Sequence, residues 1–244
     1  MLISGNKSDK GLVRENNEDA LYVDDKAGVY ILADGMGGHE GGEIASNIAV
    51  NTIAKILSSS AMMPQNNNLE DIIRSALYGA NNAIISYRKK HVEVIDMAST
   101  IVISKFHDDI ATFTHLGDSR AYLFRKNGDL VQLTDDDSLV MEMVKQGLIN
   151  KDDSRRHSLR NIVTRYIGTT NLAIPEIHQC EVGTSDCIML CSDGLTNMLN
   201  EDEISSILGR NDSIGPQDIC NLLVDSANKN GGEDNITVIV IQNK

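Results

Sequence analysis

Four aspartates stand where apolar runs of the sequence end or begin. Asp34 follows Val-Tyr-Ile-Leu-Ala and opens a glycine-rich stretch, and Asp193 follows Ile-Met-Leu-Cys-Ser. Asp118 comes after a run that alternates in polarity, and Asp234 stands just before Ile-Thr-Val-Ile-Val-Ile. Carboxylates that gather at one end of a sheet repel one another unless hard cations lie between them. The pattern therefore predicts a cation site.

The expected strand directions predict where three of these carboxylates meet. Asp34 and Asp193 lie at the carboxyl ends of their strands and Asp234 at the start of its own, and in an antiparallel sheet those ends coincide at one edge. Such an all-oxygen site suits Mg²⁺ or Mn²⁺. Adjacent glycines let the backbone approach closely and offer carbonyl ligands, namely Gly35, Gly194 and Gly232. The alternative is that each Asp-Gly pair only caps a turn, which explains one pair more readily than the set.

Arg14 precedes a short acidic stretch that contains Glu18 and Asp19. A guanidinium beside metal-binding carboxylates is suited to holding a phosphate oxygen through paired hydrogen bonds. Taken alone, Arg14 is more typical of an ordinary surface arginine. Together with the aspartates, it indicates chemistry on a phosphate ester.

Composition limits the class of protein. The chain has 244 residues with only three prolines, and no linker-like tract divides it, so we expect a single domain over residues 1–244. Its formal charge of −13 argues against binding to nucleic acid or an anionic membrane, which requires a basic face. The apolar runs are too short to span a bilayer.

The four cysteines lack C-x-x-C spacing. Cys187 and Cys191 lie inside an apolar run, so we expect them to be core residues. Without a signal peptide, the expected location is the reducing cytoplasm.

Short turns predict three antiparallel strand pairs, 20–24 with 29–33, 100–106 with 110–116, and 121–125 with 130–133. Apolar columns at i, i+4 spacing predict amphipathic helices directly after the glycine-rich stretch and over 69–88, with an N-cap in Asn66-Asn67-Asn68. Shorter helices are expected from the Asn200 cap to Leu208 and over 216–228.

Residues 138–170 differ, because a helical pattern over 139–146 gives way to a polar stretch without a clear period. We interpret this segment as a mobile flap on the main body. Strands that are apolar on both faces, combined with long amphipathic helices, predict an α+β fold. In this four-layer α/β/β/α sandwich, two antiparallel sheets pack face to face and helices cover each outer face.

Seven stretches together carry a resemblance over almost the whole chain. They are Arg14-x-x-Asn17-Glu18-Asp19, Asp34-Gly35-Met36-Gly37-Gly38-His39, Met97-Ala98-Ser99-Thr100, Gly117-Asp118-Ser119-Arg120, Leu133-Thr134, Cys191-Ser192-Asp193-Gly194-Leu195 and Gly232-Glu233-Asp234-Asn235-Ile236-Thr237. In order and spacing they resemble the metal-dependent protein serine/threonine phosphatases of the PPM (type 2C) family in its compact bacterial form.

The resemblance implies a function and residue roles. Two Mn²⁺ or Mg²⁺ ions would be bridged by Asp34, with the Gly35 carbonyl on one ion and Asp193 and Asp234 on the other. Glu18 and Asp19 would act through waters, Asp118 with Asp193 would hold a third, weaker ion, and Arg14 would bind the substrate phosphate. Water would then hydrolyse phosphoserine or phosphothreonine on proteins, reversing a eukaryotic-like Ser/Thr kinase.

The sequence departs from the family pattern near the expected site. Animal members commonly place a histidine after Asp-Gly, where this chain has Met36, which cannot donate a proton. His39 and a metal-bound water are the candidates for the general acid. The family's Leu-Thr-x-Asp-His-Ser reads Leu-Thr-Asp-Asp-Asp-Ser, so that Asp137 replaces a histidine. His157 is followed by Ser158 rather than proline.

Other phosphatase chemistries fit less well. No cysteine has an arginine six positions later, the stretch Asp135-x-Asp137-x-Leu139 fails the aspartyl-phosphate pattern, and no P-loop is present. Two alternatives stay open. One is a catalytically silent module of the same fold that senses metal or a partner, and the other is a phosphatase of an anti-sigma-antagonist-type regulatory protein.

Overall fold

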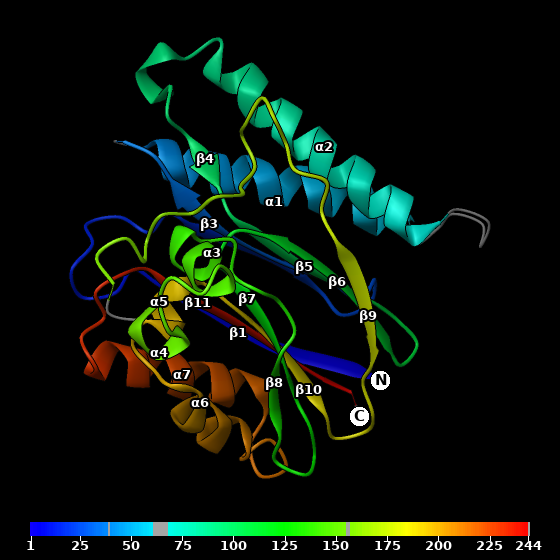
Figure 1. Ribbon diagram of the computed structural model, residues 1–244. Coiled ribbons are helices and arrows are strands. Elements are labelled where there is room, and N and C mark those ends of the chain that lie inside the picture. The colour runs from blue at the N-terminus through cyan, green and yellow to red at the C-terminus, as the bar shows by residue number, and fades with distance from the viewer. Residues whose placement is uncertain (39, 61–67, 155–156, 244) are drawn as a thin grey trace.

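The computed structural model describes residues 1–38, 40–60, 68–154 and 157–243. Two antiparallel sheets lie face to face in it, and helices cover both outer faces (Figure 1). One sheet has the strand order β1-β11-β10-β7-β8, with bounds Leu2–Asp9, Ile236–Asn243, Cys187–Cys191, Arg120–Phe124 and Leu130–Gln132. The other has the order β2-β3-β5-β6-β9, with bounds Asp19–Asp24, Val29–Met36, Ile101–His107, Ile110–Leu116 and Ile177–Glu181, and the short β4 (Ala98–Ser99) pairs with β3.

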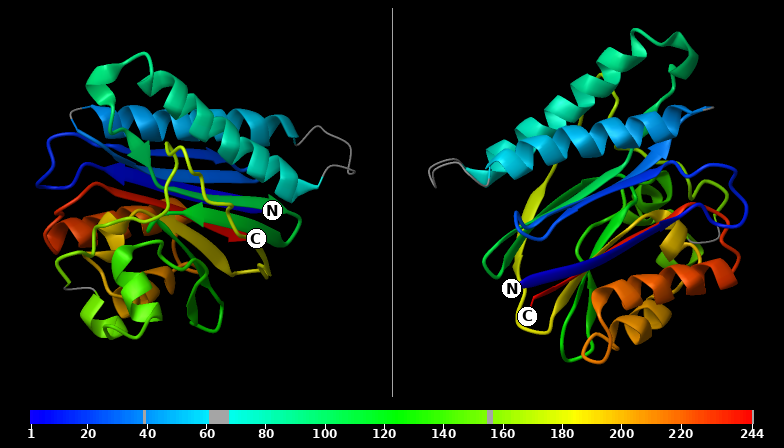
Figure 2. Two further views of the ribbon diagram at one scale, coloured as in Figure 1. Left: turned by 45° about the horizontal axis from the view of Figure 1, so that its top comes forward. Right: turned by 180° about the vertical axis from the view of Figure 1, so that it is seen from behind.

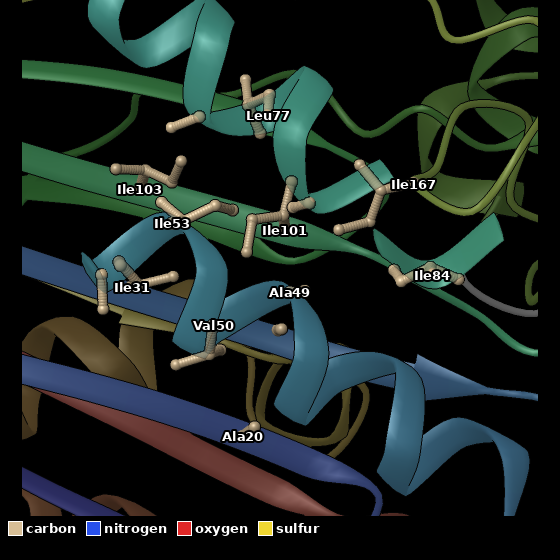
Figure 3. Close-up of a cluster of buried hydrophobic side chains, with 14 of the residues drawn as sticks. Ala20, Ile31, Ala49, Val50, Ile53, Leu77, Ile84, Ile101, Ile103 and Ile167 are labelled. Atoms are coloured by element: carbon tan, nitrogen blue, oxygen red, sulfur yellow. The ribbon is translucent and has the colours of Figure 1, made fainter. Parts of the chain in front are cut away.

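Three apolar clusters fill the spaces between the four layers, because alternate residues of each strand point to opposite faces. Ile31 of β3 packs under the long helices α1 (Gly41–Ser60) and α2 (Leu69–Arg88), as Figure 3 shows. Its neighbour Leu32 faces the other sheet, where it meets a cluster that includes Leu190 of β10. The opposite face of β10, which carries Met189, packs against α5 (Asp193–Thr196), α6 (Glu201–Leu208) and α7 (Pro216–Lys229). The predicted α/β/β/α sandwich is confirmed.

The predicted hairpins and helices form with small shifts at their ends. Asn68 accepts a hydrogen bond from the Glu70 amide and caps α2, whereas Asn66 and Asn67 lie outside the described residues. Asn200 and Glu203 form reciprocal hydrogen bonds that begin α6. Cys187 and Cys191 are fully buried and unpaired, as expected for core residues. Among the described helices, none is long and apolar enough to cross a membrane.

Besides the two-residue β4, two longer strands of the described chain were not predicted from the sequence. β1 is a mixed polar segment with a glycine, and it forms along β11 with its outer edge against α7. A side chain at Gly5 would collide with the backbone of Gln217, so glycine allows α7 to lie this close. β9 contributes the outer edge of the second sheet beside β6.

The segment 138–170 lies between β8 and β9 and contains α3 (Leu139–Lys145). It also contains the single-turn α4 (Lys151–Ser154). The short 3-10 helix η1 (Val92–Val94) lies outside this segment, between α2 and β4. Ser138 and Val163 pair as an antiparallel bridge, which closes the segment at its base. Figures 1 and 2 place this segment at the same end of the sandwich as the loops that follow β1 and precede β11.

Candidate metal centre

The four aspartates converge at one end of the sandwich, where they line a cavity of about 220 Å³. Asp34 lies near the end of β3, and Asp118 occupies the turn between β6 and β7. Asp193 is the first residue of α5, directly after β10, and Asp234 precedes β11. The cavity is also lined by Arg14, Glu18, Gly35, Met36, Gly37, Thr100, Asn161, Val163 and Asn235.

The prediction that Asp34, Asp193 and Asp234 meet at the edge of one sheet is wrong. β3 belongs to one sheet, and β10 and β11 belong to the other. The carboxylates therefore face each other across the space between the two sheets. An apolar strand pattern predicts burial on both faces, but it does not indicate which sheet the strand joins. The sequence therefore could not assign β3, β10 and β11 to their sheets.

Glycines allow the strands that carry the carboxylates to come together. A Cβ at Gly194 would collide with the carbonyl of Asn235, so glycine lets α5 pack against the start of β11. A Cβ at Gly35 would likewise collide with the carbonyl of Gly42. These two positions bring Asp193 close to Asp234 and set Asp34 beneath the start of α1.

Burial and mutual repulsion raise the pKa values of the gathered carboxyl groups. Burial, followed by the charges of Asp19, Asp193, Asp118 and Asp234, raises the pKa of Asp34 well above its usual range. Burial raises the pKa of Asp193 to about 6, with a further contribution from the charge of Asp234. Burial and the nearby Asp193 raise the pKa of Asp118 to about 8. The cavity therefore gathers carboxyl groups whose ionised forms repel one another.

Glu18 and Asp19 lie beside Asp34, because Asp19 of β2 pairs directly with Asp34 of β3. The Asp19 carboxylate is buried, and burial raises its pKa to about 7 even though hydrogen bonds from Thr237 and Ser192 lower it. The Ser192 hydroxyl donates to Asp19 Oδ2 at 2.9 Å, whereas Oδ1 has no hydrogen-bond partner among the described residues. Burial also raises the pKa of Glu18.

The backbone of Asp34 is fixed by the segment that precedes β5. The Asp34 amide donates to Thr100 Oγ1 at 3.0 Å, and the Thr100 amide donates to the Asp34 carbonyl at 2.9 Å. The Ser99 hydroxyl donates to the same carbonyl at 2.9 Å. Thr100 Oγ1 also lies 2.8 Å from Ser119 Oγ, next to Asp118. Sequence reasoning missed these positioning roles, although both residues lie in the motifs already noted.

Asn235 fixes the loop that carries Arg14. Its buried side chain donates to the carbonyls of Lys10 and Asn16 at 3.0 and 2.8 Å, and it accepts from the Glu18 amide at 2.8 Å. Arg14 Nη2 lies 2.8 Å from Asp234 Oδ2. The guanidinium thus sits at the mouth of the cavity, half-exposed, where an incoming anion would meet it.

The donor set fits hard divalent cations. Across the described residues, no group of three or more His, Cys, Asp or Glu side chains is arranged to hold a metal ion, so waters and the Gly35 carbonyl would have to complete the ligand set. Mg²⁺ keeps several waters and is commonly held by only one or two carboxylates, and Mn²⁺ prefers the same oxygen ligands. Buried carboxylates that repel one another, together with the unsatisfied Asp19 Oδ1, are what such ions would stabilise.

A family model described as protein phosphatase 2C matches residues 13–214 of the chain. The chain belongs to the protein phosphatase 2C family. It is 34% identical over 239 residues to the serine/threonine phosphatase Stp of Listeria welshimeri, covering 97% of this chain and 94% of that one. The sequence-based predictions of the family and of a protein serine/threonine phosphatase are confirmed.

Solved structures of phosphatases share the fold. The S. agalactiae serine/threonine phosphatase superposes with a TM-score of 0.91 at 32% identity, and the match covers 100% of both chains. The catalytic domain of the phosphatase PstP in complex with two manganese ions gives a TM-score of 0.86 at 31% identity, covering 99% of this chain and 97% of that one.

One phosphatase 2C position that the sequence marked as unusual has a clear structural role. Asp137, which replaces the family's histidine, accepts from the Gly117 amide at 3.2 Å and from Arg165 Nη1 at 3.3 Å. Its backbone accepts from the Thr164 amide at 2.8 Å. The side chain therefore ties the base of the flap to the turn that carries Asp118.

Two further expectations concern the general acid. Met36 lines the cavity, and its thioether has no proton to donate. His39, the candidate named from the sequence, lies outside the described residues.

Proposed function

We propose that this cavity is the catalytic centre in which the chain hydrolyses phosphoserine and phosphothreonine on proteins with the help of two Mn²⁺ or Mg²⁺ ions. The observation that carries the proposal is the gathering of partly or fully buried carboxylates from both sheets around one small cavity. Bound cations would remove the repulsion, polarise the phosphoryl oxygens and lower the pKa of a water molecule that attacks phosphorus.

The residue roles follow from position. Asp34, central among the charges, would contact both ions, with the Gly35 carbonyl on one of them and Asp193 and Asp234 on the other. The half-buried Glu18 and the buried Asp19 would orient waters bound to the ions, because their carboxylates can accept hydrogen bonds from those waters. Thr100 would keep Asp34 in place by bonding its backbone on both sides.

Arg14 would bind the substrate phosphate. Its guanidinium pairs with Asp234, and an incoming phosphate oxygen would offer a second acceptor for the N–H groups of the same guanidinium. A leaving serine or threonine alkoxide needs a proton. Met36 cannot supply it, so we assign this role to a water in the cavity, with His39 as the protein candidate.

A third, weaker ion would be held by Asp118 together with Asp193. The charge of Asp193 helps to raise the pKa of the buried Asp118, and a cation between the two would relieve that repulsion. Manganese is favoured for the central pair, since the related PstP structure is described as a complex with two manganese ions.

The physiological reaction would reverse a eukaryotic-like Ser/Thr kinase. Dephosphorylation of a lysate phosphoproteome by the wild type, compared with the Asp193→Ala variant, identifies the substrates and separates a general protein phosphatase from one that acts on an anti-sigma-antagonist-type protein.

The direct test is turnover of p-nitrophenyl phosphate and of a phosphothreonine peptide with Mn²⁺, with and without EDTA. We expect activity that EDTA removes and that Asp34→Ala and Asp193→Ala abolish without loss of folding. Asp108→Asn, in the exposed turn between β5 and β6, is the matched control and should retain activity. Activity that survives chelation contradicts the two-metal proposal. A folded protein without activity under any condition favours the silent binding module.

A further inference from the structure

Large apolar side chains are exposed on three loops around the mouth of the cavity. Leu12 and Val13 stand directly before Arg14 and are 69% and 65% exposed. Ile95 is 60% exposed, and Ile162, on the flap, is 43% exposed. We call these four residues the apolar rim. Single exposed apolar residues are ordinary, but several around one polar cavity indicate a contact surface.

The three loops border the cavity from different directions. Arg14 lines it beside Val13, and Asn161 and Val163 line it on either side of Ile162. The loop with Ile95 reaches it through Gly37, a lining residue whose missing side chain leaves space against Met97 and Asp96. Figures 1 and 2 agree that the loop after β1, the loop before β4 and the flap all lie at this end of the sandwich.

Hydrogen bonds hold the Leu12–Val13 pair in its outward position. The Leu12 amide donates to the Gly232 carbonyl at 2.8 Å. The buried Asn235 side chain bonds the backbone on both sides of the pair, at Lys10 and Asn16. Because these hydrogen bonds fix the backbone of the loop at three points, the exposure of Leu12 and Val13 is a defined feature of the structure.

The other two loops are fixed in the same manner. In the turn before β4, Val94 is buried, and its carbonyl accepts from the Met97 amide at 3.1 Å, which leaves Ile95 outside. In the flap, the Ile162 carbonyl accepts from the Leu139 amide at 2.8 Å, so the backbone of Ile162 is paired while its side chain faces outward.

We infer that the apolar rim binds the residues on either side of the phosphorylated residue, and that the preferred substrates are extended phosphopeptide segments with apolar side chains at those positions. This inference rests on the proposed function. A phosphate inside a cavity of about 220 Å³ leaves the neighbouring residues of its own chain at the mouth. Apolar neighbours would there cover apolar surface that is otherwise exposed to water.

Two phosphoserine peptides of equal length and charge test this, one with leucine and valine beside the phosphoserine and one with serine and asparagine. The measured quantity is kcat/KM for each peptide with Mn²⁺, divided by kcat/KM for p-nitrophenyl phosphate, which has no neighbouring residues. We expect the wild type to prefer the apolar peptide about ten-fold, because partial burial of one or two aliphatic side chains gives discrimination of this order.

The double variant Leu12→Ser/Val13→Ser should reduce this preference to about two-fold or less. Ile110→Ser is the matched control, since Ile110 is also exposed but is the first residue of β6, at the opposite end of that strand from Asp118. Equal kcat/KM values for the two peptides in the wild type overturn the inference. So does a preference that the double variant retains, or one that Ile110→Ser reduces as strongly.

Two other outcomes are also decisive. If the double variant changes the oligomeric state in size-exclusion chromatography while the peptide preference stays, the rim contacts a second copy of the chain and the inference is wrong. If p-nitrophenyl phosphate is not hydrolysed, the proposed function fails. Fluorescence anisotropy of the two labelled peptides with Mn²⁺ then tests peptide binding by the apolar rim independently of catalysis. Tighter binding of the apolar peptide supports the inference, and equal binding overturns it.

Discussion

Replacing Asp193 with asparagine should stabilise the metal-free protein at pH 8 while it abolishes phosphatase activity with Mn²⁺. The reason lies in the burial of Asp193 next to Asp234, which raises its pKa from 3.8 to about 6. Asparagine keeps the shape of the side chain without its charge. The Asn197 amide, which donates to Asp193 Oδ2 at 3.0 Å, finds an oxygen acceptor in either residue.

The sign and size of the effect follow from proton linkage. A raised carboxyl pKa means that the folded state binds the proton more tightly than the unfolded state, so this stability is present below pH 3.8 and is lost as the pH rises through about 6. A pKa shift from 3.8 to about 6, at about 1.4 kcal/mol per unit, means that ionised Asp193 lowers the free energy of unfolding by about 3 kcal/mol at pH 8. Asp193 keeps some exposed surface, and solvent screening makes this an upper figure.

Thermal unfolding in EDTA measures the effect. A chain of this size gains about 2–4 °C per kcal/mol, so the variant should unfold up to about 10 °C higher at pH 8. The gain should fall below about 1 kcal/mol at pH 4, because this pH lies only just above the ordinary carboxyl pKa of 3.8, and the folded wild-type carboxyl is still protonated there. Asp108→Asn makes the same chemical change in an exposed turn, at a positive φ that asparagine tolerates, and should change stability by less than about 0.5 kcal/mol. A variant no more stable than the wild type at pH 8 would refute the charge argument.

Three further substitutions have defined outcomes. Arg14→Ala should raise KM for a phosphopeptide about ten-fold or more with a smaller change in kcat, because it removes a contact to the phosphate, and an unchanged KM in steady-state kinetics would contradict that role. Asn235→Ala removes three hydrogen bonds to one loop and should lower the free energy of unfolding by about 2–4 kcal/mol in urea titration; a loss under about 0.5 kcal/mol would mean that the loop is held by other contacts. Asp137→Ala separates the base of the flap from Gly117 and should accelerate tryptic cleavage within residues 138–170, while an unchanged cleavage rate would show that the flap does not depend on this residue.

The elements that carry local signals were predictable from the sequence. The hairpin between β7 and β8 follows from Asn127-Gly128, because Gly128 adopts a φ of 96° that a left-handed turn position requires. α2 follows from its apolar face, whose members such as Ile73 and Leu77 are buried in the structure. Asp34, Asp118, Asp193 and Asp234 were named as candidates because each stands at the end of such an element.

Features that depend on contacts between distant segments were not predictable in the same way. β1 has no apolar period of its own and becomes a strand only beside β11 and α7. Thr100 holds Asp34 across 66 positions of sequence, and Asn235 holds Glu18 across 217. Such hydrogen bonds between side chains and backbone form only when folding brings distant loops together. No local sequence pattern therefore predicts them.

The most direct test of the central claim is the anomalous scattering of crystals grown with Mn²⁺. The account predicts two manganese peaks in the cavity, one between Asp34 and Gly35 and the other between Asp34, Asp193 and Asp234. Manganese bound only elsewhere on the protein, with these carboxylates left without a cation, would contradict it.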